Sequence, residues 1–266
     1  MARMILKKVV VVHMQPLGKE SISTFKVLKA VLKEEKINAK FIERSLLKEN
    51  DFNGIDLAIA LGGDGTFLKA ARLITGSTPL LGVNSDIAGK EGFFMPANRL
   101  NLRKSIKRII SGRFKKIQLT RLEARIDGKK IKEAALNEFY IGSEKAYGTF
   151  RCAVIVNDIK EMQKNSGIVV GTPAGSHAWL KSCGGTVVPI DSRGFRYIVR
   201  EPYTGRLVKG YSLLGGLLGK HDSISIISYK SNAVLIADSL GAGHKITKGS
   251  VVKISPSKQN LNMVYF

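Results

Sequence analysis

The sequence predicts a chain in two parts, an α/β domain built on a parallel sheet and a following antiparallel, β-rich domain. The first part is indicated by short apolar runs that alternate with amphipathic helical stretches up to about Pro96. One run, Leu57–Leu61, is apolar at every position, as in a strand buried on both faces. The second part is indicated by short strands after Gly112, separated by Gly, Asn-Asp and Ser-Asn turns.

The elements of the first part follow in regular order. The expected strands are Val9–His13, Ala39–Glu43, Leu57–Leu61 and Pro79–Val83. The expected helices run from a Ser21 or Ser23 cap to Glu35, from Phe67 onward, and from Asn98 to Ile110. Strands that alternate with helices predict a Rossmann-like parallel sheet with flanking helices, in which ligands bind beyond the carboxyl ends of the strands.

The second part begins with a hairpin. Leu122, Ala124 and Ile126 alternate with polar residues, and Asp127-Gly128 is a strong turn signal. Further strands are expected at Phe139–Ile141, Phe150–Val156, Ile168–Val170, Tyr197–Arg200, Ile224–Ser228, Val234–Ala237 and Val251–Ile254. The pattern predicts an α/β domain of residues 1–98 and a β-rich domain of residues 99–266, whose last strand can return to the first domain.

Charge is the strongest compositional feature. Lys and Arg number 43 against 21 Asp and Glu, which gives a formal net charge of +22 and a pI near 10.0. Such a surplus favours anionic partners. The lysines lie in short pairs spread along the chain with few aromatic residues between them, so a nucleic-acid interface is not expected.

The sequence also indicates a compartment. No apolar stretch approaches the roughly 18 residues of a membrane span, and the first apolar run is too short for a signal-peptide core. Cys152 and Cys183 fit no zinc or redox spacing, and the four histidines are scattered. We therefore expect a cytoplasmic protein with buried thiols, no membrane contact and no structural metal.

A glycine turn after the third strand is the first candidate site. Gly62, Gly63 and Gly65 allow backbone angles and close approach that a Cβ forbids. The start of the helix that follows offers free N–H groups and the positive end of its dipole to an anion. Asp64 is unusual there, because a carboxylate beside a phosphate pocket is costly unless it holds a metal or moves a proton. The alternative is a plain tight turn, since Gly and Asp are ordinary turn residues.

Two further candidates lie in the β-rich part. Ser166–Gly185 again indicates a strand, a glycine-rich turn and a short helix from His177, which fits a second phosphate or a ribose. Trp179 could offer a flat surface to adenine, although the residue type alone favours packing in the core. The pair Asn137-Glu138 could bind a base edge and a ribose hydroxyl; composition alone favours a solvent-facing pair.

These three pieces, in this order, resemble the NAD kinase family. The family carries a GGDG turn, a downstream Asn-Glu, and a TPTGSTAY-like segment followed by Gly-Gly. Here they are Gly62-Gly63-Asp64-Gly65, Asn137-Glu138, and Thr172–Trp179 followed by Gly184-Gly185. The resemblance runs from about Val9 to the final strands. Lipid kinases and phosphofructokinases share GGDG alone, and lipid kinases have an Asn-Glu where this chain has Phe67-Leu68.

The resemblance implies an enzyme that moves a phosphoryl group from ATP, or another donor, to the 2′-hydroxyl of the adenosine ribose of NAD. It implies that Asp64 is the catalytic carboxylate, that Mg²⁺ comes with the nucleotide, and that the protein forms a homodimer or homotetramer. Residues expected at the ATP phosphates are Gly62, Gly63, Gly65, Thr66, Asn84 and the basic candidates Lys69 and Arg72. Residues expected at NAD are Asn137, Glu138, Thr172, Ala174, Ser176, His177, Ala178, Trp179 and Ser182.

The chain departs from the family pattern at several positions. Ala174 replaces a Thr or Ser, Ser166 replaces an acidic residue, and Asp238-Ser239 stands where the family has Asp-Gly. The extra residues after Asn84 resemble the divergent branch typified by the mitochondrial and some plant enzymes. These departures leave the choice between NAD and NADH open.

Two other functions are consistent with the sequence. One is a related kinase that acts on a lipid or sugar and leaves NAD unchanged. The other is a non-enzymatic, basic nucleotide- or nucleic-acid-binding protein, for which binding should depend strongly on salt and be indifferent to Asp64.

Overall fold

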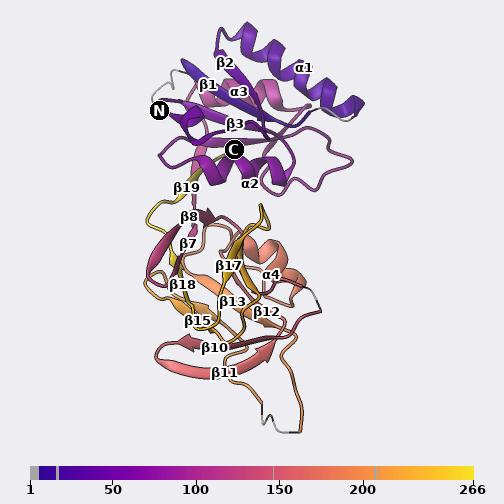
Figure 1. Cartoon of the computed structure of the whole chain (residues 1–266). Coiled ribbons are helices and arrows are strands. Elements are labelled where there is room, and N and C mark those ends of the chain that lie inside the picture. Colours follow the sequence, from indigo (N-terminus) through magenta and orange to yellow (C-terminus); the bar gives the residue numbers. More distant parts are fainter. Residues whose placement is uncertain (1–5, 16–17, 146, 207, 209) are drawn as a thin grey trace. The chain divides into compact units, whose positions relative to one another are not determined.

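The computed structural model describes residues 6–15, 18–145, 147–206, 208 and 210–266 (Figure 1). The chain forms two compact units, one of residues 1–118 with 261–266 and one of residues 119–260. The first is a mixed α/β unit and the second is built from antiparallel strands, which confirms the predicted fold class.

The first unit contains a seven-stranded sheet with the order β2-β1-β3-β4-β19-β6, in which β5 also pairs with β4. Its strands are β1 (Lys8–His13), β2 (Asn38–Glu43), β3 (Leu57–Gly62), β4 (Leu80–Asn84), β5 (Ala97–Asn98), β6 (Lys115–Leu119) and β19 (Leu261–Tyr265). The pairs of β1 with β2 and β3, and of β4 with β3, β5 and β19, are parallel. Every residue of β3 and β4 is buried, as their apolar composition predicts.

Helices cover both faces of this sheet (Figure 1). They are α1 (Lys19–Glu34), α2 (Asp64–Leu73) and α3 (Leu102–Ile110), with a short 3-10 helix η1 (Glu49–Phe52). The apolar stripes of α1 and α3 share one core with the sheet. All three predicted helix starts were wrong. α1 begins at Lys19 with Gly18 as its N-cap, so neither Ser21 nor Ser23 caps it. α2 begins at Asp64, because the carbonyl of Gly63 accepts N–H bonds from Thr66 and Phe67. α3 begins at Leu102, because Asn98 belongs to strand β5 and pairs there with Asn84 of β4.

The first unit extends beyond residue 98, where the sequence places the domain boundary. Leu102, Ile106 and Ile109 of α3 pack in the same core as β1 and β3, so α3 belongs to the parallel sheet. The chain also returns at its end, where Met263 of β19 is in register with Leu80 of β4.

The second unit contains two six-stranded sheets with the orders β11-β10-β15-β18-β7-β8 and β14-β13-β12-β9-β16-β17. The first sheet has β7 (Leu122–Ile126), β8 (Lys129–Ala135), β10 (Phe150–Val156), β11 (Ile159–Asn165), β15 (Ile224–Ser228) and β18 (Val251–Pro256). The second has β9 (Glu138–Ser143), β12 (Gly167–Gly171), β13 (Phe195–Arg200), β14 (Gly215–Leu218), β16 (Ala233–Ala237) and β17 (His244–Ile246). Apolar side chains of both sheets form one core.

The Asp127-Gly128 hairpin is confirmed. Asp127 and Gly128 have φ values of 50° and 81°, and β7 and β8 pair antiparallel on either side. Strand β11 was missed because the residues it buries are polar, namely Gln163 and Asn165, so no apolar alternation marks it.

No described helix is long and apolar enough to cross a membrane.

The two thiols are free. Cys152 is buried, and burial raises its thiol pKa to about 12. Cys183 is only half-buried, so the expectation of buried thiols holds for Cys152 alone.

Candidate functional site

In the first unit the glycine turn joins β3 to α2 at the carboxyl edge of the sheet. A Cβ on Gly62 would overlap the side chain of Thr66, so the turn can close only around a glycine. The hydroxyl Oγ1 of Thr66 is buried and lacks a hydrogen-bond partner among the described residues. Asp64 is half-buried in the first helical turn. The turn thus places one carboxylate at the start of a helix, as predicted.

The carboxylate of Asp64 is fixed by backbone. Its Oδ1 accepts a 2.9 Å hydrogen bond from the N–H of Phe94, and its Oδ2 accepts one of 3.1 Å from Phe93. That segment is itself held in place, because the Phe94 ring stacks on Phe67 of α2 at 4.7 Å. A Cβ on Gly82 of β4 would overlap the carbonyl of Phe94. The carboxylate therefore has one defined orientation before any ligand binds.

The predicted phosphate residues divide by position. Lys69 and Arg72 lie further along α2 than Asp64, by about 7.5 and 12 Å of helix axis at 1.5 Å per residue, so Lys69 is the nearer to the turn. Asn84 is buried, and its side chain organises the loop that follows β4. Its Oδ1 accepts the N–H of Asp86 at 3.0 Å, and its Nδ2 donates to the carbonyl of Lys90 at 3.1 Å.

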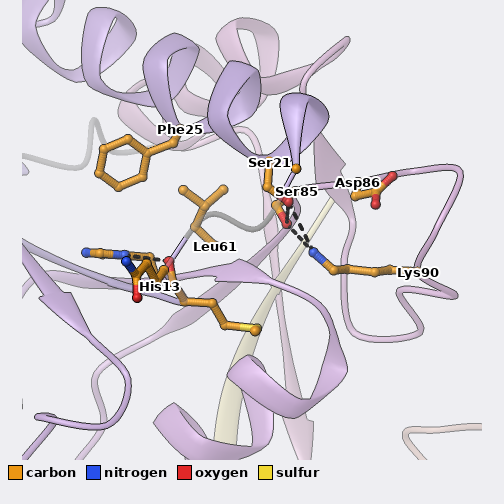
Figure 2. Close-up of a pocket in the computed structure, with 10 residues that line it drawn as sticks. His13, Ser21, Phe25, Leu61, Ser85, Asp86 and Lys90 are labelled. Carbon is orange, nitrogen blue, oxygen red and sulfur yellow. Dashed lines mark hydrogen bonds between the residues drawn. The ribbon is translucent and has the colours of Figure 1, made fainter.

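A pocket of about 200 Å³ lies beside this turn (Figure 2). Its lining residues are His13, Met14, Gln15, Gly18, Ser21, Phe25, Leu61, Ser85, Asp86 and Lys90. None of them was among the predicted site residues. The one sequence signal was the run of extra residues after Asn84, because that run contains Ser85, Asp86 and Lys90.

In the second unit, Asn137 and Glu138 are both buried rather than solvent-facing. Asp238 holds their backbone: its Oδ1 accepts N–H bonds from Asn137 at 2.6 Å and Glu138 at 3.3 Å, and its Oδ2 accepts one from Leu136 at 3.0 Å. Among the described residues, Asn137 Oδ1 and Glu138 Oε2 are buried without a hydrogen-bond partner. Buried polar atoms almost always have a hydrogen-bond partner, so two neighbouring atoms without one indicate a ligand site.

Burial sets the charge at this position. Burial, together with the smaller effect of the charge of Asp238, raises the pKa of Glu138 to about 8. Burial lowers the pKa of Arg121 to about 10 while the charge of Asp238 opposes this shift, so Arg121 stays cationic at neutral pH. Glu138 is thus mostly protonated at neutral pH and can donate a hydrogen bond as well as accept one.

The segment that begins at Thr172 packs directly against Asn137. Thr172 N donates to the Asn137 carbonyl at 2.8 Å, and Thr172 Oγ1 donates to the Leu136 carbonyl at 2.6 Å. A Cβ on Gly175 would overlap the carbonyl oxygen of Asn137. Ala174 and Ser176 are buried as well. The structure therefore brings the predicted Asn-Glu pair and the predicted small-residue turn into one cluster.

The rest of that segment turns outward. The helix expected from His177 is divided into η2 (Gly175–His177) and α4 (Trp179–Ser182). Ser176 and His177 fasten it to the next loop, since Ser176 Oγ accepts the N–H of Val188 at 3.0 Å and His177 Nε2 lies 3.0 Å from the Val188 carbonyl. Ala178 is half-buried and Ser182 is exposed.

Trp179 packs on the outer face of the second sheet. Its ring stacks on Tyr140 at 5.2 Å, and the Arg200 guanidinium lies 5.3 Å from the ring centroid. The ring packs on one side and is half-buried, so Trp179 is not the fully buried core residue that its type favours.

Comparison with known proteins points to one family. Residues 1–114 match the ATP-NAD kinase N-terminal domain. The probable NADH kinase of Oryza sativa subsp. japonica is 27% identical over 267 residues, covering 91% of this chain and 80% of the relative. The yeast NADH kinase, solved with NADH, superposes with a TM-score of 0.82 at 18% identity over 98% of this chain and 84% of that chain. The NAD kinase of Archaeoglobus fulgidus, solved with ATP, gives a TM-score of 0.76 at 21% identity over 97% of this chain and 93% of that chain.

Proposed function

We propose that the chain is a member of the NAD kinase family and that it phosphorylates the 2′-hydroxyl of the adenosine ribose of NAD with ATP, yielding NADP. The observation that carries the proposal is the pair of buried, open polar atoms on Asn137 and Glu138. A ligand with both donors and acceptors, such as an adenosine, satisfies an amide oxygen beside a protonated carboxyl group.

Asp64 is proposed to act on the acceptor hydroxyl. The ribose oxygen attacks the γ-phosphorus, the bond to the β–γ bridging oxygen breaks, and ADP leaves. The hydroxyl proton passes to the Asp64 carboxylate and then to solvent. The two N–H bonds from Phe93 and Phe94 support this role, because they hold the carboxylate in one orientation.

The glycine turn and its neighbours are proposed to bind the phosphates of ATP. Gly65 leaves the backbone open to a phosphate, because a Cβ there would have only Arg44 Nη1 within 4 Å, at 3.8 Å, whereas Thr66 and Lys90 fill the space beside Gly62 and Gly63. Lys69 and Arg72 of α2 are both candidates to add positive charge. The phosphates are expected to carry the Mg²⁺ ion, which neutralises their charge.

The segment from Thr172 to Ser182 is proposed to complete the NAD site around Asn137 and Glu138. Thr172, Ala174 and Ser176 shape its buried part, and His177, Ala178, Trp179 and Ser182 form its outer part. The packing of Gly175 on Asn137 supports this grouping.

NADH is a second candidate acceptor. The rice relative, which spans nine tenths of this chain, is a probable NADH kinase, and the chain carries the extra residues after Asn84. Assaying both acceptors at matched concentrations decides the preference.

We also propose a cytoplasmic homo-oligomer, dimer or tetramer. Edge strands β11 and β14 expose apolar side chains, with Ile159 58%, Met162 57% and Leu217 65% accessible. The two free thiols fit a reducing compartment. Light scattering on the purified protein measures the assembly.

The decisive test is direct. Purified protein is incubated with ATP, Mg²⁺ and NAD, and NADP is measured with an NADP-specific dehydrogenase. Formation of NADP supports the proposal, and ATP hydrolysis or lipid phosphorylation without NADP contradicts it.

A further inference from the structure

The loop after β4 places a lysine amine among two serine hydroxyls. Nζ of Lys90 donates to Ser85 Oγ at 2.7 Å and to Ser21 Oγ at 3.3 Å, and the two hydroxyl oxygens lie 3.1 Å apart (Figure 2). The three groups come from the β4 end, the following loop and the first turn of α1. They form a closed triangle on the wall of the 200 Å³ pocket.

A count of donors shows what the triangle still offers. An ammonium group has three N–H donors, of which the two serines take two. One of the two hydroxyl hydrogens is used between the serines. One N–H of Lys90 and one serine O–H therefore remain free to donate to a ligand, and the Lys90 ammonium adds a positive charge. Among the described residues, no carboxylate lies within ion-pair distance of Lys90.

The triangle is rigidly supported. Ser85 is 4% exposed, its N–H donates to the Gly62 carbonyl at 2.9 Å, and its carbonyl accepts the Thr24 hydroxyl at 3.0 Å. Asn84 Nδ2 holds the Lys90 carbonyl. The Lys90 stem crosses the glycine turn, with Cδ 3.1 Å from the position of a Cβ on Gly63. A cation held by packing in this way is ready for a ligand without reorganisation.

The rest of the pocket combines apolar walls with one carboxylate. Phe25, Leu61 and Met14 supply apolar walls. Asp86 also lines the pocket, and its Oδ1 already accepts the N–H of Gly89 at 3.0 Å. One carboxylate beside a phosphate chain is compatible with a divalent cation carried by that chain.

We propose that this pocket binds a chain of phosphates from the phosphoryl donor, with Lys90 as the residue that binds its anionic oxygens. The inference rests on the proposed kinase function and names residues for it that lie outside the glycine turn. Because the Lys90 stem passes over Gly63, the residue before Asp64, the phosphate group it binds lies at the turn that carries the catalytic carboxylate. Two sources share this chemistry, the tail of ATP and inorganic polyphosphate.

The test compares Lys90→Ala and Lys90→Gln with wild type by calorimetric titration of ATP and of inorganic tripolyphosphate. Lys90→Gln keeps most of the stem and one hydrogen bond. It therefore allows the test to be made even if Lys90→Ala does not fold. The matched control is Lys104→Ala, which removes an exposed lysine from α3 in the same unit. We expect at least a tenfold weaker binding of the phosphate ligand in both Lys90 variants and no change in the control. In the kinase assay, KM for ATP should rise at least tenfold while KM for NAD stays within twofold.

The outcomes separate the two proposals. Weakening of ATP alone assigns the pocket to the nucleotide, and weakening of both ligands shows that free polyphosphate also binds. Unchanged binding of both ligands in both Lys90 variants overturns the inference, even if the wild-type protein makes NADP. If the wild type makes no NADP but its ATP binding still depends on Lys90, the phosphate site stands and the NAD kinase proposal fails.

Discussion

Oδ1 of Asp238 accepts a 2.6 Å hydrogen bond from the backbone N–H of Asn137, across 101 residues of chain. The same carboxylate binds the N–H groups of Leu136 and Glu138. Asp238 has a φ of 52° and follows β16, which pairs with β9. One acidic side chain at the end of a neighbouring strand thus fixes the backbone of Asn137 and Glu138, the two residues proposed to bind the adenosine.

Asp238→Asn should therefore weaken NAD binding without touching NAD. The amide NH₂ replaces one carboxylate oxygen and faces an N–H donor, so at least one of the three bonds is lost. We expect the free energy of unfolding to fall by roughly 1–3 kcal/mol and KM for NAD to rise, with KM for ATP unchanged. Urea unfolding and steady-state kinetics measure both. Equal rises in the two KM values would show that the effect is not local to Asn137 and Glu138.

Glu138→Gln should change how stability depends on pH. The folded protein holds the Glu138 proton up to a pKa of about 8, whereas the ordinary pKa is 4.5. Between these values the folded state binds the extra proton, so a rise in pH lowers the free energy of unfolding by up to about 1.4 kcal/mol per pH unit through this group. The variant lacks this loss, and its stability relative to wild type should improve steadily from pH 5 to pH 8.

The control for that series is Glu144→Gln, which neutralises an exposed carboxylate of the same unit. Its stability relative to wild type should stay nearly constant over the same pH range. A flat difference for Glu138→Gln as well would mean that Glu138 is ionised in the folded protein.

Asp64→Asn should preserve folding and abolish phosphoryl transfer. Asparagine can still accept the N–H of Phe94 through one oxygen, so the loss of stability should be about 1 kcal/mol. Its amide cannot accept a proton from the ribose hydroxyl. NADP formation should fall by at least a hundredfold, whereas Asp191→Asn, an exposed acid in the second unit, should behave as wild type. Transfer at the native rate by Asp64→Asn would remove Asp64 from the mechanism.

Gly175→Ala should disturb the NAD site through sterics alone. The added methyl group overlaps the carbonyl of Asn137, so the two segments must separate. Overpacking of this kind costs roughly 1–3 kcal/mol, and KM for NAD should rise with it. Gly76→Ala is the matched control, because a Cβ there meets nothing within 4 Å. Thermal unfolding and NAD titration that fail to separate the two variants would contradict the packing of Gly175 on Asn137.

Local sequence pattern predicted those features that depend on neighbours in the chain. The apolar run Leu57–Leu61 and the Asp127-Gly128 turn each specify their own conformation, because burial period and turn geometry are properties of a few consecutive residues. The same reasoning located the GGDG turn. For Asn137-Glu138 composition alone favoured a solvent-facing pair, which is wrong because both residues are buried, and only the family resemblance assigned the pair a binding role. Local pattern also failed for β11, where the buried positions carry Gln163 and Asn165 instead of apolar residues.

The sequence by itself determined the two-part fold class and the residue types at each turn. Only the tertiary structure decided that Asp238 holds Asn137 and that Lys90 joins Ser21 and Ser85 beside the glycine turn. These contacts join residues 101, 69 and 5 positions apart, and strand order and register bring their elements together. Hydrophobic periodicity cannot predict such contacts, because it indicates which face of an element is buried and not which distant residue that face contacts.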